Sequence, residues 1–267
     1  MSVKIAAIQL QTLPMSNARL DYYIRRCAKM GVNLITLGEY VLNNFFKELE
    51  KIPSSMIKEQ SEHRLAILKD LAKSYNVTII APIILYKKDK PYKAVARFTP
   101  NISFFYEQKI LINYKHWDED RFFANNMKDM SIPLFIHEGL RVGIISGFEA
   151  HFDIFWQQVM KKKVDLVLMP SVSTFESRIR WSELLKTRAF LNSAYILRVN
   201  RVGSFKDKAH SWYFYGDTAL YSPDGTLEAS LGDGEEMLIG EININAVIEA
   251  RKIWGFRNQL VKKELLN

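Results

Sequence analysis

Short apolar segments of strand length recur along the whole chain, and amphipathic segments of helix length separate many of them. Strands are predicted at residues 3–9 and 34–37. The predicted helix between them carries apolar residues at i, i+3, i+4, i+7 and i+8, a spacing that faces a core: Leu20, Tyr23, Ile24, Cys27 and Ala28. A second helix is predicted at about 61–75. Three consecutive strands follow it, at 77–86, 94–98 and 102–110.

The second half of the chain repeats this order. Its predicted strands are 140–146, 166–169, 195–200 and 217–221. Helices are predicted from the first of these strands to about residue 161, at about 177–192 and near 246–254. No linker rich in Pro, Gly or Ser divides the chain. This order predicts an α/β fold of two packed sheets with helices outside them, in a single domain of residues 1–267.

Composition favours one large core. With 267 residues and 48% hydrophobic residues, the chain can bury a sizeable apolar interior, which argues against disorder. No apolar run approaches the roughly 18–20 residues of a membrane-spanning helix. The N-terminus, M-S-V-K-I-A-A-I-Q-L, has no basic region before a long apolar segment, so we expect no signal peptide. The single Cys27 cannot form an internal disulfide, which favours the cytoplasm.

The net charge of +8 would suit a nucleic-acid binder, but the basic residues are spread along the chain beside acidic ones. The densest basic run, Lys161 to Lys163, falls at a predicted helix end, where cations are favoured by the helix dipole. We therefore predict no nucleic-acid partner. One Cys and five scattered His give no metal-ligand cluster, and glycine-rich nucleotide motifs are absent. The sequence predicts neither a metal nor a cofactor.

Two charged residues follow or interrupt apolar strands. In G-V-N-L-I-T-L-G-E-Y, Glu39 comes directly after a predicted strand. A carboxylate there would be partly desolvated, with a raised pKa suited to general-base work, unless it simply faces solvent at the strand end. Lys109 lies in an apolar stretch, E-Q-K-I-L-I, where it could hold a developing oxyanion. It could equally be a lysine that protects an edge strand.

The stretch V-G-I-I-S-G-F-E-A-H-F, residues 142–152, reads as a buried strand running into a sharp turn. Several hydrolases carry a nucleophile on such a turn. Here the corner residue is Gly147, which has no side chain. Its neighbour Ser146 should point to the opposite face, because successive side chains on a strand alternate. Cys27 lies on the core-facing stripe of the first helix and is interpreted as a packing residue.

These segments resemble the nitrilase (carbon–nitrogen hydrolase) superfamily. The apolar run into Glu39 is similar to one family motif, with Gly38 where Pro is usual, and E-Q-K-I-L resembles the lysine segment R-K-I-H-L. Further similar segments follow in the family's order: V-D-L-V-L-M-P-S-V-S, the W-x6-R-A from Trp181, N-R-V-G, and Y-G-D-T-A-L-Y-S-P-D-G. The match covers nearly the whole chain.

The resemblance implies a four-layer α-β-β-α sandwich and a Cys nucleophile assisted by a Glu base and a Lys that stabilises the oxyanion. Glu39 and Lys109 match the family's Glu and Lys. The family pattern G-x-x-x-C-[YFW]-[DE] fits residues 143–149 with Gly147 in the place of Cys. The predicted catalytic positions are therefore Glu39, Lys109 and Gly147, with the nucleophile missing.

The family often has a second Glu after the lysine. Asp118 and Glu119 are both candidates, and we favour Glu119. The loop 114–123 would then line the mouth of a pocket, although it could also be a charged surface loop. The predicted substrate-binding residues are Glu119, Trp117, Phe148 and Ser173.

Three hypotheses about function follow. The chain is a catalytically impaired hydrolase that binds a small amide or carbamoyl compound, an active hydrolase in which Glu39 activates water, or a non-catalytic scaffold. The resemblance also implies a homodimer. The C-terminal tail of the chain, about residues 251–267, carries the apolar residues Trp254, Phe256 and Leu260. These side chains need cover from the same subunit or from a second one.

Overall fold

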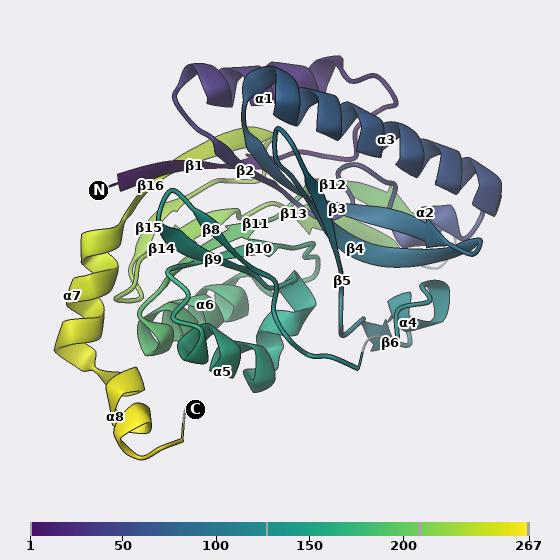
Figure 1. Cartoon of the computed structure of the whole chain (residues 1–267). Helices are drawn as coiled ribbons and strands as arrows, with labels where there is room; N and C mark the ends of the chain where they lie inside the picture. The colour runs from purple at the N-terminus through teal and green to yellow at the C-terminus, as the bar shows by residue number, and fades with distance from the viewer. Residues whose placement is uncertain (1, 127, 208–209, 266–267) are drawn as a thin grey trace.

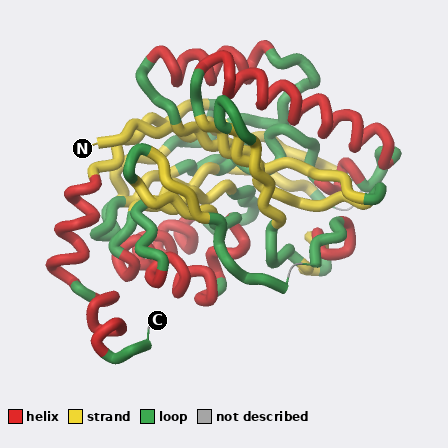
Figure 2. The backbone as a smooth tube through the Cα atoms, in the orientation of Figure 1, coloured by secondary structure: helices red, strands yellow, loops and turns green. Residues whose placement is uncertain are grey.

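Two six-stranded sheets lie face to face, with helices on both outer faces (Figure 1). The computed structural model describes residues 2–126, 128–207 and 210–265. The strand order of the first sheet is β16-β1-β2-β3-β4-β5, and that of the second is β15-β14-β11-β10-β9-β8. Figure 2 shows the strands between the two helical layers. The predicted four-layer α/β sandwich is confirmed.

The first sheet comprises β1 (Ser2–Gln9), β2 (Leu34–Leu37), β3 (Thr78–Lys87), β4 (Lys90–Phe98), β5 (Ser103–Glu107) and β16 (Glu236–Asn243). Its outer face is covered by α1 (Ala18–Lys29) and α3 (Ser54–Tyr75). Strands β1, β2 and β3 run parallel to one another. The C-terminal ends of these strands therefore share one edge of the sheet, which places the segment after β2 at that edge.

The second sheet comprises β8 (Leu134–His137), β9 (Leu140–Ile144), β10 (Leu166–Pro170), β11 (Tyr195–Val199), β14 (Ala219–Tyr221) and β15 (Leu227–Ser230). The helices α5 (Asp153–Lys161) and α6 (Arg178–Asn192) cover its outer face. Because β9, β10 and β11 are parallel, the turns that follow them also lie at one edge.

Shorter elements complete the fold. They are α2 (Phe46–Leu49), β6 (Asn113–Tyr114), β7 (Trp117–Asp118), α4 (Glu119–Phe122), the 3-10 helix η1 (Gly147–His151), β12 (Val202–Lys206), β13 (Ser211–Tyr215), α7 (Ile244–Trp254) and α8 (Phe256–Lys262). None of the described helices is long and apolar enough to cross a bilayer.

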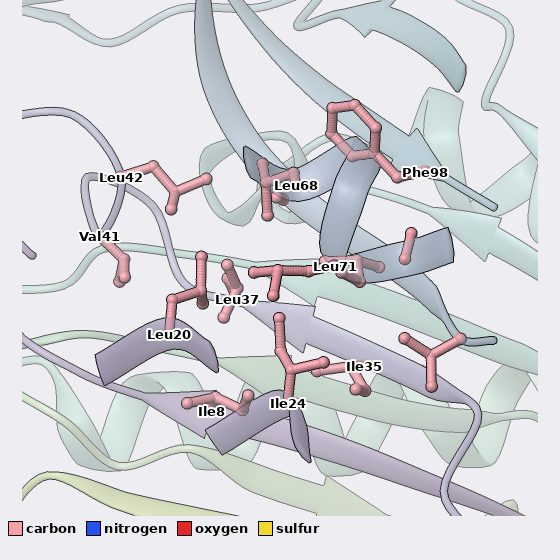
Figure 3. Close-up of a cluster of buried hydrophobic side chains, with 14 of the residues drawn as sticks. Ile8, Leu20, Ile24, Ile35, Leu37, Val41, Leu42, Leu68, Leu71 and Phe98 are labelled. Atoms are coloured by element: carbon pink, nitrogen blue, oxygen red, sulfur yellow. The ribbon is translucent and has the colours of Figure 1, made fainter. Parts of the chain in front are cut away.

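The alternation of strand side chains divides the apolar residues into layers. On β1, Ala6 and Ile8 face the helical layer, whereas Val3 and Ile5 pack between the sheets. Figure 3 shows Leu20 and Ile24 of α1 packed near Ile8, Ile35 and Leu37 of the sheet, with Leu68 and Leu71 of α3 in the same cluster. The apolar stripe predicted for the first helix is therefore the face that covers the sheet.

The structure differs from the sequence prediction at several elements. Strand β5 ends at Glu107 rather than near residue 110, so Lys109 lies after the strand. Helix α3 begins at Ser54 rather than near Ser61. Its buried face includes Ser61 and Arg64, and polar residues there obscured the apolar pattern. The antiparallel pair β12–β13 was not predicted.

Candidate active site

Glu39 follows β2 at the point where the first sheet approaches the second. Its backbone N–H donates to the carbonyl oxygen of Ser171, 3.1 Å away, just after β10. At the preceding position, a Cβ on Gly38 would lie 2.8 Å from the carbonyl carbon of Asn200, closer than real contacts allow. Glycine therefore permits a backbone approach that the Pro usual in the resembling family would block.

Tyr40 continues this segment with φ of +56°, a left-handed conformation that is unusual for a bulky residue. Its carbonyl oxygen accepts a hydrogen bond from Arg201 Nη1 at 3.0 Å and another from the Thr12 hydroxyl at 2.9 Å. Such a conformation persists only where the surroundings fix it. The turn after Glu39 is thus held in place by contacts from two other segments.

A buried ion cluster lies at this turn. Lys93 Nζ, from β4, is 2.6 Å from Glu39 Oε2 and 2.9 Å from each carboxylate oxygen of Glu119. The Tyr40 hydroxyl donates to Glu119 as well. The exposed fractions of Glu39, Lys93 and Glu119 are 3%, 5% and 0%. Three carboxylate oxygens are enough to accept the three N–H donors of the ammonium group.

The protonation of this cluster follows from burial and charge. Burial raises the pKa of Glu39 to about 7; the attraction of Lys93 opposes this shift, and the repulsion of Glu119 adds to it. Burial alone would lower the pKa of Lys93, but Glu119 and Glu39 outweigh it and the pKa is raised. Glu39 is therefore a carboxyl group that can take up and return a proton near neutral pH.

Lys109 lies elsewhere. Its backbone N–H donates to Glu149 Oε1 at 2.6 Å, and its side chain is half-buried. The residue that pairs with Lys93 across the sheet is Gln108, whose N–H donates to the Lys93 carbonyl at 3.0 Å. The structure thus brings Glu39 and Glu119 together through Lys93, and the cation in contact with Glu39 is not Lys109.

Gly147 begins η1 and is buried. A Cβ at this position would lie 2.6 Å from the Cβ of Ser171. Ser171 therefore contacts both predicted positions, Glu39 through its carbonyl oxygen and Gly147 through its side chain. Ser146 instead lines a small cavity of about 10 Å³ together with Lys109 and Glu149, on another side of the turn.

Trp117, Phe148 and Ser173 line one cavity of about 470 Å³, which we call the inner chamber. Its lining includes Trp117, Phe148 and Val172. In the chain these residues are immediate or near neighbours of Glu119, Gly147 and Ser171. Three of the four predicted substrate-binding residues therefore line one chamber, whereas Glu119 belongs to the ion cluster and does not line it.

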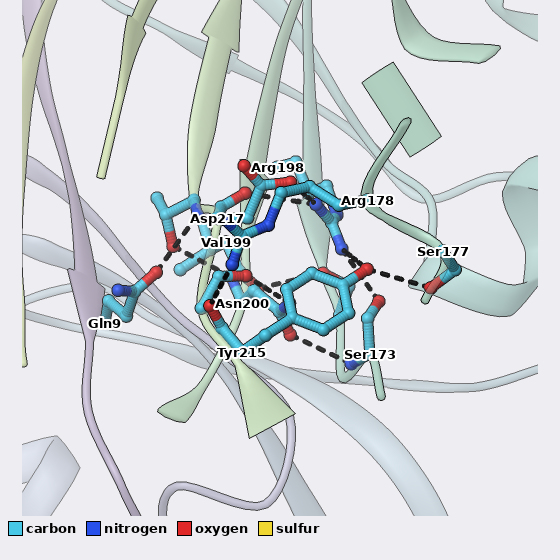
Figure 4. A network of polar contacts seen from close by, with 12 residues as sticks. Gln9, Ser173, Ser177, Arg178, Arg198, Val199, Asn200, Tyr215 and Asp217 are labelled. Carbon is cyan, nitrogen blue, oxygen red and sulfur yellow. Dashed lines mark hydrogen bonds and ion pairs between the residues drawn. The ribbon is translucent and has the colours of Figure 1, made fainter. Parts of the chain in front are cut away.

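Lys93 and Arg198 were not among the site residues predicted from the sequence. Arg198, on β11, is fully buried; its guanidinium donates to Ser173 Oγ at 2.7 Å and pairs with Asp217 Oδ2 at 3.0 Å (Figure 4). Both basic residues stand in apolar strand segments, Y-K-A-V-A and Y-I-L-R-V. A charge in such a segment needs a buried partner, and this signal could have identified both. Among the described residues, no group of three or more His, Cys, Asp or Glu is arranged to hold a metal ion.

Comparisons with known proteins agree with this architecture. A sequence model of the carbon–nitrogen hydrolase family matches residues 4–252. The crystal structure of a carbon–nitrogen hydrolase from Helicobacter pylori superposes with a TM-score of 0.84 at 19% identity, covering 96% of this chain and 94% of that one. Deaminated glutathione amidase from a Synechocystis species is 22% identical over 92% of this chain and 94% of its own length.

Beta-ureidopropionase from Arabidopsis thaliana is also 22% identical, over 85% of this chain but only 60% of its own length. The family match covers most of the residues of both sheets and of the helices that flank them. The chain belongs to the carbon–nitrogen hydrolase family.

Proposed function

We propose that this protein binds a small amide or carbamoyl compound in the inner chamber and is catalytically impaired. The observation that carries this proposal is the buried cluster of Glu39, Lys93 and Glu119, which Ser171 connects to Gly147. In the motif G-x-x-x-C-[YFW]-[DE] of the carbon–nitrogen hydrolase family, Gly147 takes the position of the nucleophilic Cys. The acid, the ammonium group and the chamber are thus present, but the side chain that would attack is not.

The energetics of the cluster support this proposal. Burying three charged groups carries a desolvation penalty of several kcal/mol per ion, which their contacts with one another at best offset. A site with no ligand would gain little by keeping them. The loss of a covalent nucleophile lowers turnover by several orders of magnitude in hydrolases that depend on one. Lys93, whose donors already face Glu39 and Glu119, would also have to break a contact before it could stabilise an oxyanion.

A second candidate is an active hydrolase without a covalent intermediate, and the raised pKa of Glu39, about 7, favours it. In this scheme Glu39 takes a proton from water, and the resulting hydroxide forms a bond to the amide carbon. The carbon–nitrogen bond then breaks, and the proton returns to the departing amine. The products are a carboxylic acid and ammonia or an amine.

Calorimetry and ammonia release, measured on one panel of small amides and carbamoyl compounds, separate these candidates. We expect binding of at least one compound without measurable turnover. Turnover that is lost in Glu39→Gln, and kept in the exposed control Glu62→Gln, would favour direct water attack instead. If no compound binds, the proposal is wrong and the scaffold hypothesis gains weight.

We also propose that the protein is a homodimer that uses its C-terminal tail. Ile253 and Trp254 at the end of α7 are 69% and 48% exposed. Part of the tail is covered within the subunit, since Trp254 and Phe256 both contact the ring of Phe190. Residues 266 and 267 of the predicted tail lie outside the described residues. Sedimentation at micromolar concentration should show a dimer, and a monomer alone would contradict this proposal.

A cytoplasmic location completes the proposal. Cys27 is the single cysteine and is fully buried, and burial raises its pKa to about 12. Its thiol is therefore protonated and unreactive at neutral pH. A chain that uses no disulfide is typical of a reducing compartment. Fractionation of cells that express the full chain tests this location.

A further inference from the structure

The inner chamber continues into a second cavity. This outer chamber, of about 840 Å³, shares Thr174, Phe175 and Arg180 with the inner chamber. Both volumes fall in the range of small-molecule sites, roughly 300–1,000 Å³. The shared residues place the two chambers next to each other at the start of α6, and we call the two chambers together the cleft.

Phe175 lines both chambers. It has φ of +63°, a conformation that bulky residues rarely adopt, and its side chain is 57% exposed. The ring contacts the edge of His116 at a centroid distance of 5.3 Å and that of Trp117 at 6.5 Å. Backbone strain of this kind persists where the surroundings fix it and often marks a binding site. Phe175 is thus held where the two chambers meet.

Aromatic side chains line both chambers. The rings of Tyr114 and Phe148 are 5.8 Å apart, and those of His151 and Trp181 are 4.8 Å apart, in the inner chamber. Tyr213 and Tyr215 line the outer chamber. Flat walls of this type favour a flat ligand group, because aromatic rings stack or meet edge to face at such distances.

The charged residues of the cleft are mainly basic. Arg180 lines both chambers, is exposed, and has no ion-pair or hydrogen-bond partner in the described part of the chain. Arg178, in the outer chamber, donates to the Tyr215 carbonyl at 3.2 Å and lies over the Tyr215 ring (Figure 4). Glu176 is the acidic residue of the outer lining. Arg180 is therefore the guanidinium that remains available to a ligand.

We propose that the cleft binds an aryl amide or aryl carbamoyl compound that also carries a carboxylate, and that Arg180 pairs with this carboxylate. The amide end would lie in the inner chamber toward Gly147, and the carboxylate would lie near Phe175, where the two chambers meet. A guanidinium forms two parallel hydrogen bonds with a carboxylate, which fixes the ligand's orientation as well as its charge. This inference rests on the proposed function, since it specifies the ligand of the same cleft.

A matched pair of probes tests the charge. Terephthalamate and terephthalamide have the same aryl amide, and differ only in that a second amide replaces the carboxylate. We expect the native protein to bind terephthalamate about tenfold more tightly by calorimetry, a difference of about 1.4 kcal/mol. The preference should fall below about twofold in Arg180→Gln and shrink at high salt, because the pair is exposed. It should survive in Arg25→Gln, which removes the same charge from exposed α1 on the opposite outer layer.

Each other outcome has a defined meaning. Equal binding of the two aryl probes by the native protein would overturn the role of Arg180 and leave the proposed function intact. Succinamate bound as tightly as terephthalamate would overturn the aryl requirement. An undiminished preference in Arg180→Gln would assign the carboxylate to another residue and overturn the inference. Failure of every amide probe to bind would overturn both this inference and the proposed function.

Discussion

The ammonium group of Lys93 lies 2.6 Å from a carboxylate oxygen of Glu39, and this buried pair joins β4 to the residue that follows β2 by two positions. Glu119, the first residue of α4, completes the cluster, so that two carboxylates share one cation. Burial, to which the repulsion of Glu119 adds, explains why the pKa of Glu39 is raised although a lysine is in contact with it. The cluster is a structural unit as well as a candidate catalytic one.

Lys93→Met should therefore destabilise the protein strongly. Removing the cation leaves two buried carboxylates without a partner, which costs about 3–5 kcal/mol when one member of a buried pair is lost. Lys109→Met is the matched control, because it removes a half-buried lysine that makes no contact with the cluster, and it should cost less than about 1 kcal/mol. The free energy of unfolding in urea measures both. Equal losses of unfolding free energy in the two variants would contradict a larger contribution of the cluster to stability.

The pH dependence of stability should report the titration of Glu39. Its pKa is raised from 4.5 to about 7 on folding, so the folded protein binds this proton more tightly than the unfolded chain. The stability that comes from Glu39 is therefore complete below pH 4.5 and is lost as the pH rises through 7.

Gln resembles the protonated carboxyl at every pH, so Glu39→Gln should lack this loss. Relative to the native protein, the variant should gain up to about 3 kcal/mol of stability between pH 4.5 and pH 8, at about 1.4 kcal/mol per pKa unit. Urea unfolding at a series of pH values measures the difference. Glu62→Gln, on the exposed side of α3, should follow the native curve. A constant difference between native and Glu39→Gln across this range would contradict the raised pKa.

The sequence predicted the layers of the fold because the strands alternate and α1 has a clear apolar stripe. It predicted Glu39 at a strand end because the apolar run of residues 34–37 stops just before it. The lysine was harder to assign, since the apolar run after Lys109 continues past β5 without being a strand. Leu111 in that run is buried in an aromatic cluster with Trp117 and Phe45. Periodicity cannot distinguish a strand from a buried irregular segment, and only the contacts of Lys93 with Glu39 and Glu119 show that it belongs to the site.

Gly147→Cys alone should not restore a well-placed thiol. A Cβ at position 147 would lie 2.6 Å from the Cβ of Ser171, which is part of a buried backbone segment and cannot swing away. Overpacking of this kind costs about 1–3 kcal/mol. The double substitution Gly147→Cys with Ser171→Gly removes the clashing atom, so it should be more stable than the single variant. Turnover on any amide that the native protein binds should appear first in the double variant.

Thermal unfolding and ammonia release compare these proteins, with Ser171→Gly alone as the control for the second change. A stable single variant with full turnover would mean that the turn relaxes more freely than the packing of Gly147 indicates. No turnover in a stable double variant would mean that Glu39 and Lys93 cannot activate a thiol at this corner.

Asp217 pairs with the buried Arg198, which in turn contacts Ser173 of the inner chamber. Substitutions of Asp217 can separate the contribution of its charge to stability from that of its backbone conformation. Asp217 has φ of +67°, and burial raises the pKa of its carboxyl despite the attraction of Arg198. Asn accepts this conformation and keeps a carbonyl acceptor, so Asp217→Asn should cost only about 1–2 kcal/mol. Asp217→Ala loses the acceptor and is strained in the left-handed region, and it should cost at least about 1 kcal/mol more.

Ser173, which accepts a hydrogen bond from Arg198 and lines the inner chamber, links this pair to ligand binding. Both Asp217 variants should therefore weaken amide binding, in the same order as their stability. Asp70→Asn, on the exposed face of α3, should change neither property. Urea unfolding and calorimetry on the same preparations provide the comparison. If Asp217→Ala were as stable as Asp217→Asn, the left-handed turn would not depend on the residue at its corner. The contacts of Arg198 with Ser173 and with the backbone carbonyl of residue 217 would then be enough to hold it.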